Sequence, residues 1–228
     1  MSLYPQRYDR NFPAFSDDDF KIIQKSTIGV AGCGGLGGYI IEHLARTGVG
    51  HLVIFDGDTF DVTNLNRQLF SNEHNIGLFK ADEAVKRVQF INSDLEITAH
   101  SVFMDETNCA TLIKDCDLVI DALDSIPTRL TLQAHCKALN IPFIHGAIGG
   151  FNAQMTTIFP GDDSLFKLYS SNKNTASKPM GNLSFVAALT ASIEVSEAFK
   201  VLTHKEDLLR KKLLIIDLLT NEFSIFEL

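Results

Sequence analysis

Three glycines with the spacing Gly-x-Gly-x-x-Gly, namely Gly32, Gly34 and Gly37, are the residues of this sequence best suited to binding a phosphate group. The first glycine of such a motif permits a tight turn, the second lets backbone approach phosphate oxygens, and the third lets a helix pack closely on a strand. Backbone N–H groups at the helix start then face the anion, and the helix dipole favours negative charge there. A turn that serves packing alone is the weaker interpretation, because the motif lies between a β-prone run and a helical one.

Two carboxylates follow predicted strands. Asp56 ends a strand at 51–55, at about the spacing from the glycines where an acidic residue accepts from a ribose hydroxyl. Asp124 comes just after a strand at 118–122, and ligands of open α/β sheets bind beyond the carboxyl ends of the strands. The polar stretch 57–70 is predicted to be a loop in the same functional location. These residues indicate a nucleotide site without saying which nucleotide binds.

The elements that carry these residues alternate between strand and helix over the first two thirds of the chain. The strands are predicted at 28–31, 51–55, 96–100, 118–122 and 142–145. Helical spacing of apolar residues covers 39–45, 81–92, 109–114 and 128–139. This alternation predicts the α/β class, with a Rossmann-like, doubly wound, mainly parallel sheet.

From residue 152 the pattern changes, and antiparallel C-terminal strands are expected. An alternating strand at 154–159 precedes a long, polar, irregular loop at 161–182. A helix at 183–203 and strands at 213–217 and 223–226 complete the chain. Without internal repeats or linkers, residues 1–228 are expected to form a single domain.

The first 26 residues are predicted to hold an N-terminal arm and a short helix at 17–24, with acidic residues in its first turn. Arg7 and Arg10 precede this helix. They are either solvated surface charges or part of a flexible arm that reaches a phosphate.

Composition excludes several classes of protein. The formal net charge of −8 argues against nonspecific binding to nucleic acid. No apolar run approaches the length of a membrane span, and the first residues lack a signal-peptide core, so a cytoplasmic protein is expected. The four cysteines include no Cys-x-x-Cys pair, which predicts buried, neutral thiols rather than disulfides or a zinc site.

Six blocks of this sequence together resemble the ThiF/MoeB/HesA family, bacterial relatives of the ubiquitin-activating E1 adenylation domain. The blocks are Arg7–Arg10, Gly32–Gly37, Asp56-x-Asp58, Asn64–Gln68, Lys80 and Asp121–Asp124. The resemblance implies an E1-like adenylation domain that uses ATP and Mg²⁺. Its substrate would be the C-terminal Gly-Gly carboxylate of a ubiquitin-like sulfur-carrier protein, activated as an acyl-adenylate with release of pyrophosphate. The product would serve sulfur transfer of the thiamine or molybdopterin type.

The resemblance also implies roles for individual residues. In-line attack on phosphorus accumulates negative charge, so Arg67 and Lys80 would lie beside the triphosphate and Asp124 would hold Mg²⁺. Arg10 would act in trans on the partner subunit's phosphates, which requires a homodimer. The residues expected around the nucleotide are Gly32, Gly34, Gly35, Gly37, Asp56, Asp58, Asn64, Arg67, Gln68, Lys80, Asp124 and Ser125.

Structural alternatives exist for these assignments. Lys80 could be an ordinary first-turn lysine, although the helix dipole disfavours a cation there. Arg67 could pair with Asp58 or Asp61, and Asp124 could cap the helix that follows it. Arg129, His145 and Asp58 could instead be structural, or could support the residues that contact the nucleotide.

Two departures from the family pattern carry predictions. Most relatives have two Cys-x-x-Cys pairs that hold zinc, whereas the corresponding region here reads Asp162–Lys167, so no structural zinc is expected. No cysteine follows Cys136, and Ser177 lies near the position where some relatives capture the carrier covalently. Adenylation without covalent capture is therefore expected.

Three other functions stay open. The stretches Asp121–Ser125 and Arg46–Gly50 also resemble the branch that activates a carboxylate on tRNA, the threonylcarbamoyladenosine dehydratases, although the acidic charge argues against a polyanionic substrate. An NAD-dependent oxidoreductase would explain the glycines and Asp56 but leave Arg67, Lys80 and Asp124 without a purpose. A non-catalytic nucleotide-binding scaffold is the third.

Overall fold

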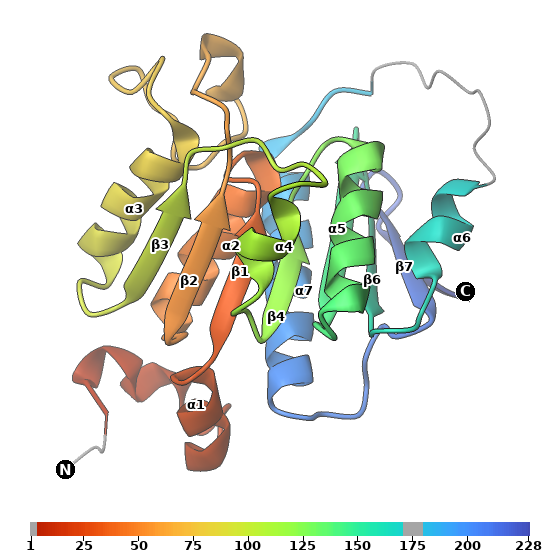
Figure 1. The fold of residues 1–228 in the computed structure, drawn as a ribbon, viewed down its shortest axis with the longest axis horizontal. Helices are drawn as coiled ribbons and strands as arrows, with labels where there is room; N and C mark the ends of the chain where they lie inside the picture. The colour runs from red at the N-terminus through yellow and green to blue at the C-terminus, as the bar shows by residue number, and fades with distance from the viewer. Residues whose placement is uncertain (1–3, 171–179) are drawn as a thin grey trace.

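An eight-stranded mixed sheet organises the computed structural model, which describes residues 4–170 and 180–228 (Figure 1). Its strand order is β3-β2-β1-β4-β5-β6-β7-β8. The five parallel strands are β1 (Thr27–Ala31), β2 (His51–Phe55), β3 (Glu96–His100), β4 (Leu118–Asp121) and β5 (Phe143–Gly149). The antiparallel strands are β6 (Asn152–Ile158), β7 (Lys212–Asp217) and β8 (Glu222–Glu227). The predicted fold class is confirmed.

Helices cover both faces of this sheet (Figure 1). One face carries α2 (Gly35–Thr47), α3 (Lys80–Ile91) and α7 (Ser184–Leu202). The other carries α4 (Cys109–Ile113), α5 (Ile126–Ala138) and α6 (Ser164–Ser170). The parallel strands are apolar almost throughout because both of their faces are covered. Along β4, Ile120 belongs to the first core and Val119 to the second.

The strand order reverses between β1 and β4, which are neighbours in the sheet although β2 and β3 lie between them in the chain. The connections from these two strands leave in opposite directions. A crevice therefore opens at their carboxyl ends, and this is where open α/β sheets bind their ligands. The glycine turn follows β1, and Asp124 follows β4.

Several element boundaries differ from the sequence expectation. Strand β5 continues to Gly149 rather than stopping at 145, and Gly150, with φ of 59°, turns the chain into β6. The region 161–182 is not an irregular loop throughout, because α6 forms within it where Leu165 packs into the second core. The predicted position of Ser177 lies outside the described residues.

The described part of the N-terminal segment is folded onto the domain rather than forming a flexible arm. It consists of a 3-10 helix, η1 (Gln6–Asn11), and α1 (Asp17–Ile23), at the end of the sheet where the strands begin (Figure 1). Tyr8 is buried against Gly48, where a Cβ would lie 2.5 Å from the tyrosine ring. The flexible-arm interpretation of these residues is therefore wrong.

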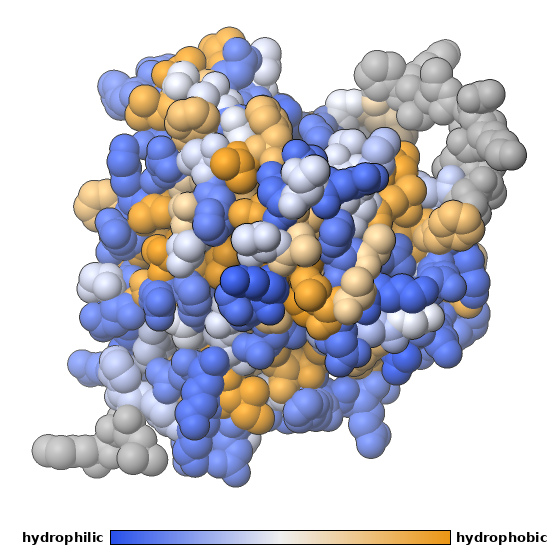
Figure 2. Space-filling model, in the orientation of Figure 1, coloured by the Kyte–Doolittle hydropathy of each residue, from blue (hydrophilic) through white to orange (hydrophobic). Residues whose placement is uncertain are grey.

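The surface over α3, α4 and α5 is mainly hydrophilic, with hydrophobic side chains interspersed (Figure 2). Among residues 4–170 and 180–228, no helix combines the length and apolar character needed to cross a bilayer. All four cysteines are free and buried, as predicted. Burial raises the pKa of the Cys109 and Cys116 thiols to about 12, so both stay protonated near neutral pH.

Candidate active site at the switch point of the sheet

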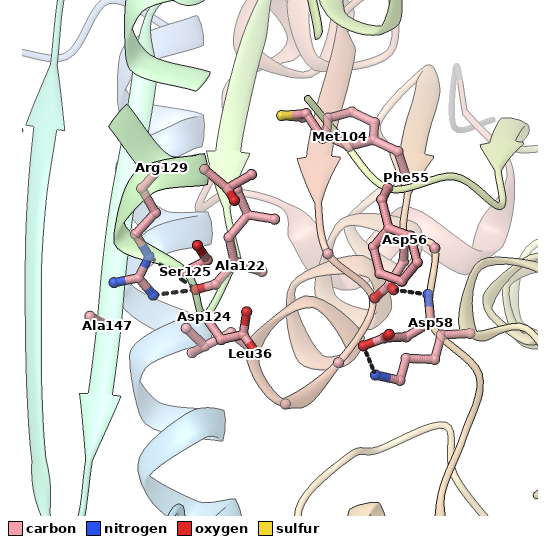
Figure 3. A pocket seen from close by; sticks show the side chains of 18 of the residues that line it. Leu36, Phe55, Asp56, Asp58, Met104, Ala122, Asp124, Ser125, Arg129 and Ala147 are labelled. Carbon is pink, nitrogen blue, oxygen red and sulfur yellow. Dashed lines mark hydrogen bonds and ion pairs between the residues drawn. The ribbon is translucent and has the colours of Figure 1, made fainter. Parts of the chain in front are cut away.

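A cavity of about 580 Å³ opens at the carboxyl ends of β1, β2 and β4 (Figure 3). It brings together most of the residues that the sequence singled out. Those that line it are Gly32, Gly34, Gly35, Asp56, Asp58, Arg67, Gln68, Lys80, Asp124 and Ser125. Gly37, Asn64 and Arg10 are the predicted residues that do not line it.

The glycine turn has the geometry that its sequence predicts. Gly32 adopts φ of 99°, a left-handed conformation that glycine tolerates without strain. A Cβ at Gly37 would lie 1.8 Å from the Gly32 carbonyl oxygen, so this position allows α2 to pack directly on the turn. Helix α2 begins at Gly35 with no side-chain cap on its first amides. These N–H groups and the helix dipole favour an anion in the cavity.

Asp56 fastens the glycine turn to the end of β2. One carboxylate oxygen accepts from the Cys33 N–H at 2.7 Å, and the other accepts from the Asp58 N–H at 2.8 Å. Burial raises the pKa of the Asp56 carboxyl, and these two hydrogen bonds oppose that rise. A carboxylate offers about four acceptor positions, so Asp56 retains capacity for a ribose hydroxyl. That role stays a prediction.

Lys80 is the first residue of α3, and its side chain is only 8% exposed. Its Nζ lies 2.9 Å from an oxygen of Asp58, whose own side chain is 53% exposed. The alternative interpretation of Lys80 as an ordinary, solvated first-turn lysine is therefore wrong. The ammonium group is held at the cavity wall by a partner that stays partly in water.

Arg67 makes no described ion pair with either acid that was considered as its partner. Its Nη1 donates to the Thr63 carbonyl at 2.9 Å and to the Asn66 side-chain oxygen at 2.8 Å. The alternative in which Arg67 pairs with Asp58 or Asp61 is wrong. Asp58 forms its ion pair with Lys80, and Asp61 caps η2 (Val62–Asn64). Arg67 thus lines the cavity with only neutral oxygens as hydrogen-bond partners among the described residues.

Asn64 and Gln68 differ in their positions. Asn64 is buried, and its side-chain oxygen accepts from the Asp61 N–H at 3.0 Å as part of a capping box. It supports the loop and does not line the cavity. Gln68 lines the cavity beside Gly34, and its Oε1 is buried with no hydrogen-bond partner within the described residues. An unsatisfied buried acceptor of this kind indicates a place for a ligand donor.

Asp124 lies exposed in the turn between β4 and α5, and none of the described hydrogen bonds or ion pairs involves its carboxylate. Ser125, not Asp124, occupies the N-cap position of α5, so the capping alternative for Asp124 is wrong. Within the described ranges, no cluster of three His, Cys, Asp or Glu side chains could form a metal site. One free carboxylate fits Mg²⁺ that takes its other ligands from phosphate and water.

Arg10 does not line the cavity of its own chain. It is exposed on η1, at the opposite end of the sheet (Figure 1). Any contact between Arg10 and a nucleotide would therefore need a second copy of the chain.

One wall of the cavity was not predicted from the sequence. Val102, Phe103 and Met104 line it just after β3, and a Cβ at Gly57 would lie 2.6 Å from the Phe103 ring. The rule that led to Asp56 and Asp124 applies here too, because 101–104 follows the carboxyl end of a predicted parallel strand.

Tyr169 and Arg129 also line the cavity. Arg129 was expected to be structural, and it is buried with hydrogen bonds to the Leu123 carbonyl. No feature of the sequence indicated a role for Tyr169, because it lies in the region 161–182, which was expected to be an irregular loop. His145 is fully buried behind Tyr169, as a structural residue would be.

Three curated proteins are similar to this chain over most of its length. The SAMP-activating enzyme E1 of Haloferax volcanii is 32% identical over 203 residues, 87% of this chain and 75% of that protein. The molybdopterin-synthase adenylyltransferase of Escherichia coli is 29% identical over 95% of this chain and 90% of its own length. The maize adenylyltransferase and sulfurtransferase MOCS3-2 is 30% identical over 97% of this chain, which spans only 48% of that protein.

Solved structures share the fold. Escherichia coli MccB with ATP superimposes with a TM-score of 0.83 at 20% identity, covering 99% of this chain and 72% of that one. The Escherichia coli tRNA N6-threonylcarbamoyladenosine dehydratase TcdA has a TM-score of 0.75 at 29% identity, covering 88% and 95%. The sequence model of the ThiF family matches residues 8–228, nearly the whole chain. This chain therefore belongs to the ThiF family and is an enzyme of the adenylyltransferase class.

Proposed function

We propose that this enzyme uses ATP to adenylate the C-terminal Gly-Gly carboxylate of a ubiquitin-like sulfur-carrier protein, forming an acyl-adenylate and releasing pyrophosphate. The observation that carries the proposal is the convergence of two cations, a free carboxylate and the uncapped start of α2 on one cavity. The names of the relatives from Haloferax volcanii and Escherichia coli support the same chemistry.

The cations suit the charge that develops during attack at phosphorus. A carboxylate nucleophile needs no deprotonation, so the protein's task is to position the reactants and to stabilise charge on the phosphoryl oxygens. Arg67 offers a planar fork of donors, and Lys80 offers a compact point charge. Both reach the cavity from segments that follow β2, opposite the turn that carries Asp124.

Asp124 is the residue that would hold Mg²⁺ together with the nucleotide. The ion, when bound, supplies additional positive charge at the phosphates. Asp124 is suited to this because its carboxylate has no described protein partner and lines the cavity. The ion pair between Lys80 and Asp58 would then open, since a triphosphate offers the lysine a more highly charged partner than one half-exposed carboxylate.

The wall formed by Val102, Phe103 and Met104 suits the flat, apolar surface of an adenine ring. It lies beyond β3, on the same side as Asp56, which would accept from the ribose. The nucleotide would thus lie across the ends of β3, β2 and β1, with its α-phosphate toward β4 and the acceptor carboxylate.

The same proposal includes a homodimer, a cytoplasmic location and a single domain over residues 1–228. It also includes a role in thiamine or molybdopterin-type sulfur transfer. Adenylation without covalent capture of the carrier is also proposed, because no cysteine follows Cys136.

The test is exchange of radiolabelled pyrophosphate into ATP, measured against a panel of carrier proteins with Gly-Gly tails. Exchange is expected only when a cognate carrier is present, since the carboxylate is the attacking group. Deleting the last glycine of that carrier should abolish exchange, and Asp124→Asn should reduce it strongly. Exchange without any carrier, or none with the whole panel, would contradict the proposal.

A second candidate is an ATP-dependent dehydratase acting on a modified tRNA, favoured by the similarity to TcdA over 95% of that chain. The net charge of −8 disfavours a polyanionic substrate. A gel shift with bulk tRNA, run beside a pull-down with Gly-Gly-tailed carriers, separates the two candidates. Binding of tRNA alone would favour the dehydratase.

A further inference from the structure

A closed ring of hydrogen bonds begins and ends on Leu123, the residue just before Asp124. On one side, the Leu123 N–H donates to Oδ1 of Asp121 at 2.9 Å, and Oδ2 of Asp121 lies 2.7 Å from Nδ1 of His145. On the other side, Nε of Arg129 donates to the Leu123 carbonyl at 3.0 Å. The two sides meet at the hydroxyl of Tyr169, 3.1 Å from Nε2 of His145 and 3.1 Å from Nη1 of Arg129.

The direction of each hydrogen bond follows from counting donors at Tyr169. Its oxygen accepts from Arg129, which can only donate, and from the side-chain amide of Gln154 at 3.1 Å. A hydroxyl has two acceptor positions and one proton, so Tyr169 must donate that proton to Nε2 of His145. His145 is then neutral and donates from Nδ1 to Asp121. Every bond in the ring has a fixed direction.

Burial is consistent with this assignment. Both His145 and Asp121 have fully buried side chains, and burial lowers the pKa of the His145 imidazole, which favours its neutral form. The side chain of Arg129 is 8% exposed and lies 3.3 Å from Asp121, whose charge it balances. The ring is complete, and fully satisfied networks of this kind hold their members rigidly.

We infer that Tyr169 is a positioning residue for Asp124, closing the ring that fixes the two peptide groups of Leu123. The second of these peptides carries the N–H of Asp124, so fixing it limits where the carboxylate can point. Asp121, Arg129 and His145 come from β4, α5 and β5. Tyr169 alone comes from α6, which follows the antiparallel hairpin. The position of α6 is thereby coupled to the turn that carries Asp124.

This inference rests on the proposed function only where it concerns Mg²⁺, because the ring itself is independent of activity. Its first test is backbone amide exchange measured by NMR on the full chain. Tyr169→Phe removes only the hydroxyl and is expected to speed exchange at the Leu123 amide about tenfold. Tyr39→Phe, on α2 and outside the cavity lining, removes the same atom and should leave Leu123 unchanged.

A second variant covers the case in which Tyr169→Phe fails to fold. Gln154→Leu keeps the tyrosine but frees one of its acceptor positions, so the direction of the hydroxyl proton is no longer enforced. A smaller increase in exchange at Leu123 is expected. Unchanged exchange at Leu123 in the folded variants would overturn the inference.

The catalytic consequence is measured separately, with the Mg²⁺ concentration that half-saturates pyrophosphate exchange. Tyr169→Phe should raise it about tenfold, as expected when a group supporting a metal ligand is lost. The KM for ATP at saturating Mg²⁺ should stay within twofold of the parent's, because the glycine turn, Arg67 and Lys80 are untouched. A parent that catalyses no exchange would refute the proposed function, whereas amide exchange would still decide whether the ring positions the turn.

Discussion

Two charged side chains in the cavity have opposite states of pairing. Lys80 is buried and paired with Asp58, whereas Asp124 is exposed and has no described partner. A buried cation with one half-exposed partner can exchange that partner at modest cost, since the carboxylate returns to water. At the residue scale, the cavity is therefore prepared for a polyanion that arrives with its own metal ion.

Lys80→Met is predicted to lower the rate of pyrophosphate exchange by about 10²–10³-fold, the usual cost of removing one group that stabilises developing charge. The matched control is Lys86→Met on the same helix, because the Lys86 side chain is 61% exposed and does not line the cavity. That variant should keep the parent rate. Both rates are measured at saturating ATP and carrier, and a Lys80→Met rate within twofold of the parent's would remove the lysine from the mechanism.

The sequence predicted the residues of the site better than their local contacts. Lys80 and Arg67 were expected at the triphosphate, and both line the cavity. The sequence could not decide between these roles and the structural alternatives. For Arg67, the hydrogen-bond partner depends on how the loop 57–70 folds. The amide of Asn64 was likewise predicted as a nucleotide contact, but it caps η2 instead.

Among the elements, the packing of α2 on the glycine turn depends most on Gly37. Gly37→Ala is predicted to destabilise the fold by at least about 2 kcal/mol, because its Cβ would lie 1.8 Å from the Gly32 carbonyl oxygen and α2 would have to move. The expected fall in Tm is about 4–8 °C.

Gly35→Ala is the matched control, since the nearest atom to its Cβ, on Arg67, is 3.9 Å away. Its Tm should stay within about 2 °C of the parent's. Equal losses of Tm in Gly35→Ala and Gly37→Ala would contradict the packing role of the third glycine.

The elements themselves followed from periodicity wherever a core was continuous. Strands β1, β2 and β4 are short, mainly apolar runs, and their boundaries were predicted to within a residue. Helix α6 was not predicted, because a helix of seven residues shows too little apolar periodicity. Its formation also depends on the packing of Leu165 into a core built from elements distant in the sequence.

At the scale of the whole molecule, the exposed position of Arg10 at the far end of the sheet makes its role a question of assembly. If it acts in trans, then mixing Arg10→Ala with Asp124→Asn subunits should restore about a quarter of the parent's exchange rate. Random pairing makes half of the dimers mixed, and each mixed dimer contains one intact site.

The control mixes Asp124→Asn with Lys80→Met, whose residues line the same cavity of one chain. Mixed dimers of these variants contain no intact site, so no activity should return. Recovery in the control, or none with Arg10→Ala, would contradict a role in trans.

Stability of the whole fold is expected to depend on Glu194, a fully buried residue of α7. Neither of its carboxyl oxygens has a hydrogen-bond partner among the described residues, and a Cβ at Gly146 would lie 2.3 Å from one of them. Burial raises the pKa of Glu194 well above its usual value of 4.5, and the charge of Asp121 adds to the rise. The folded protein therefore holds this proton more tightly than the unfolded chain does.

This difference gives the sign of the pH dependence. The contribution of Glu194 to stability is fully present below pH 4.5 and is lost as pH rises from there through the higher pKa of the folded state. Within that window the loss is about 1.4 kcal/mol per pH unit. Glu194→Gln keeps the size of the side chain and carries no proton to lose. The difference in Tm between Glu194→Gln and the parent should grow from pH 5 to pH 8, as measured by thermal unfolding, and a difference that stays constant with pH would show that the carboxyl is already solvated in the folded state.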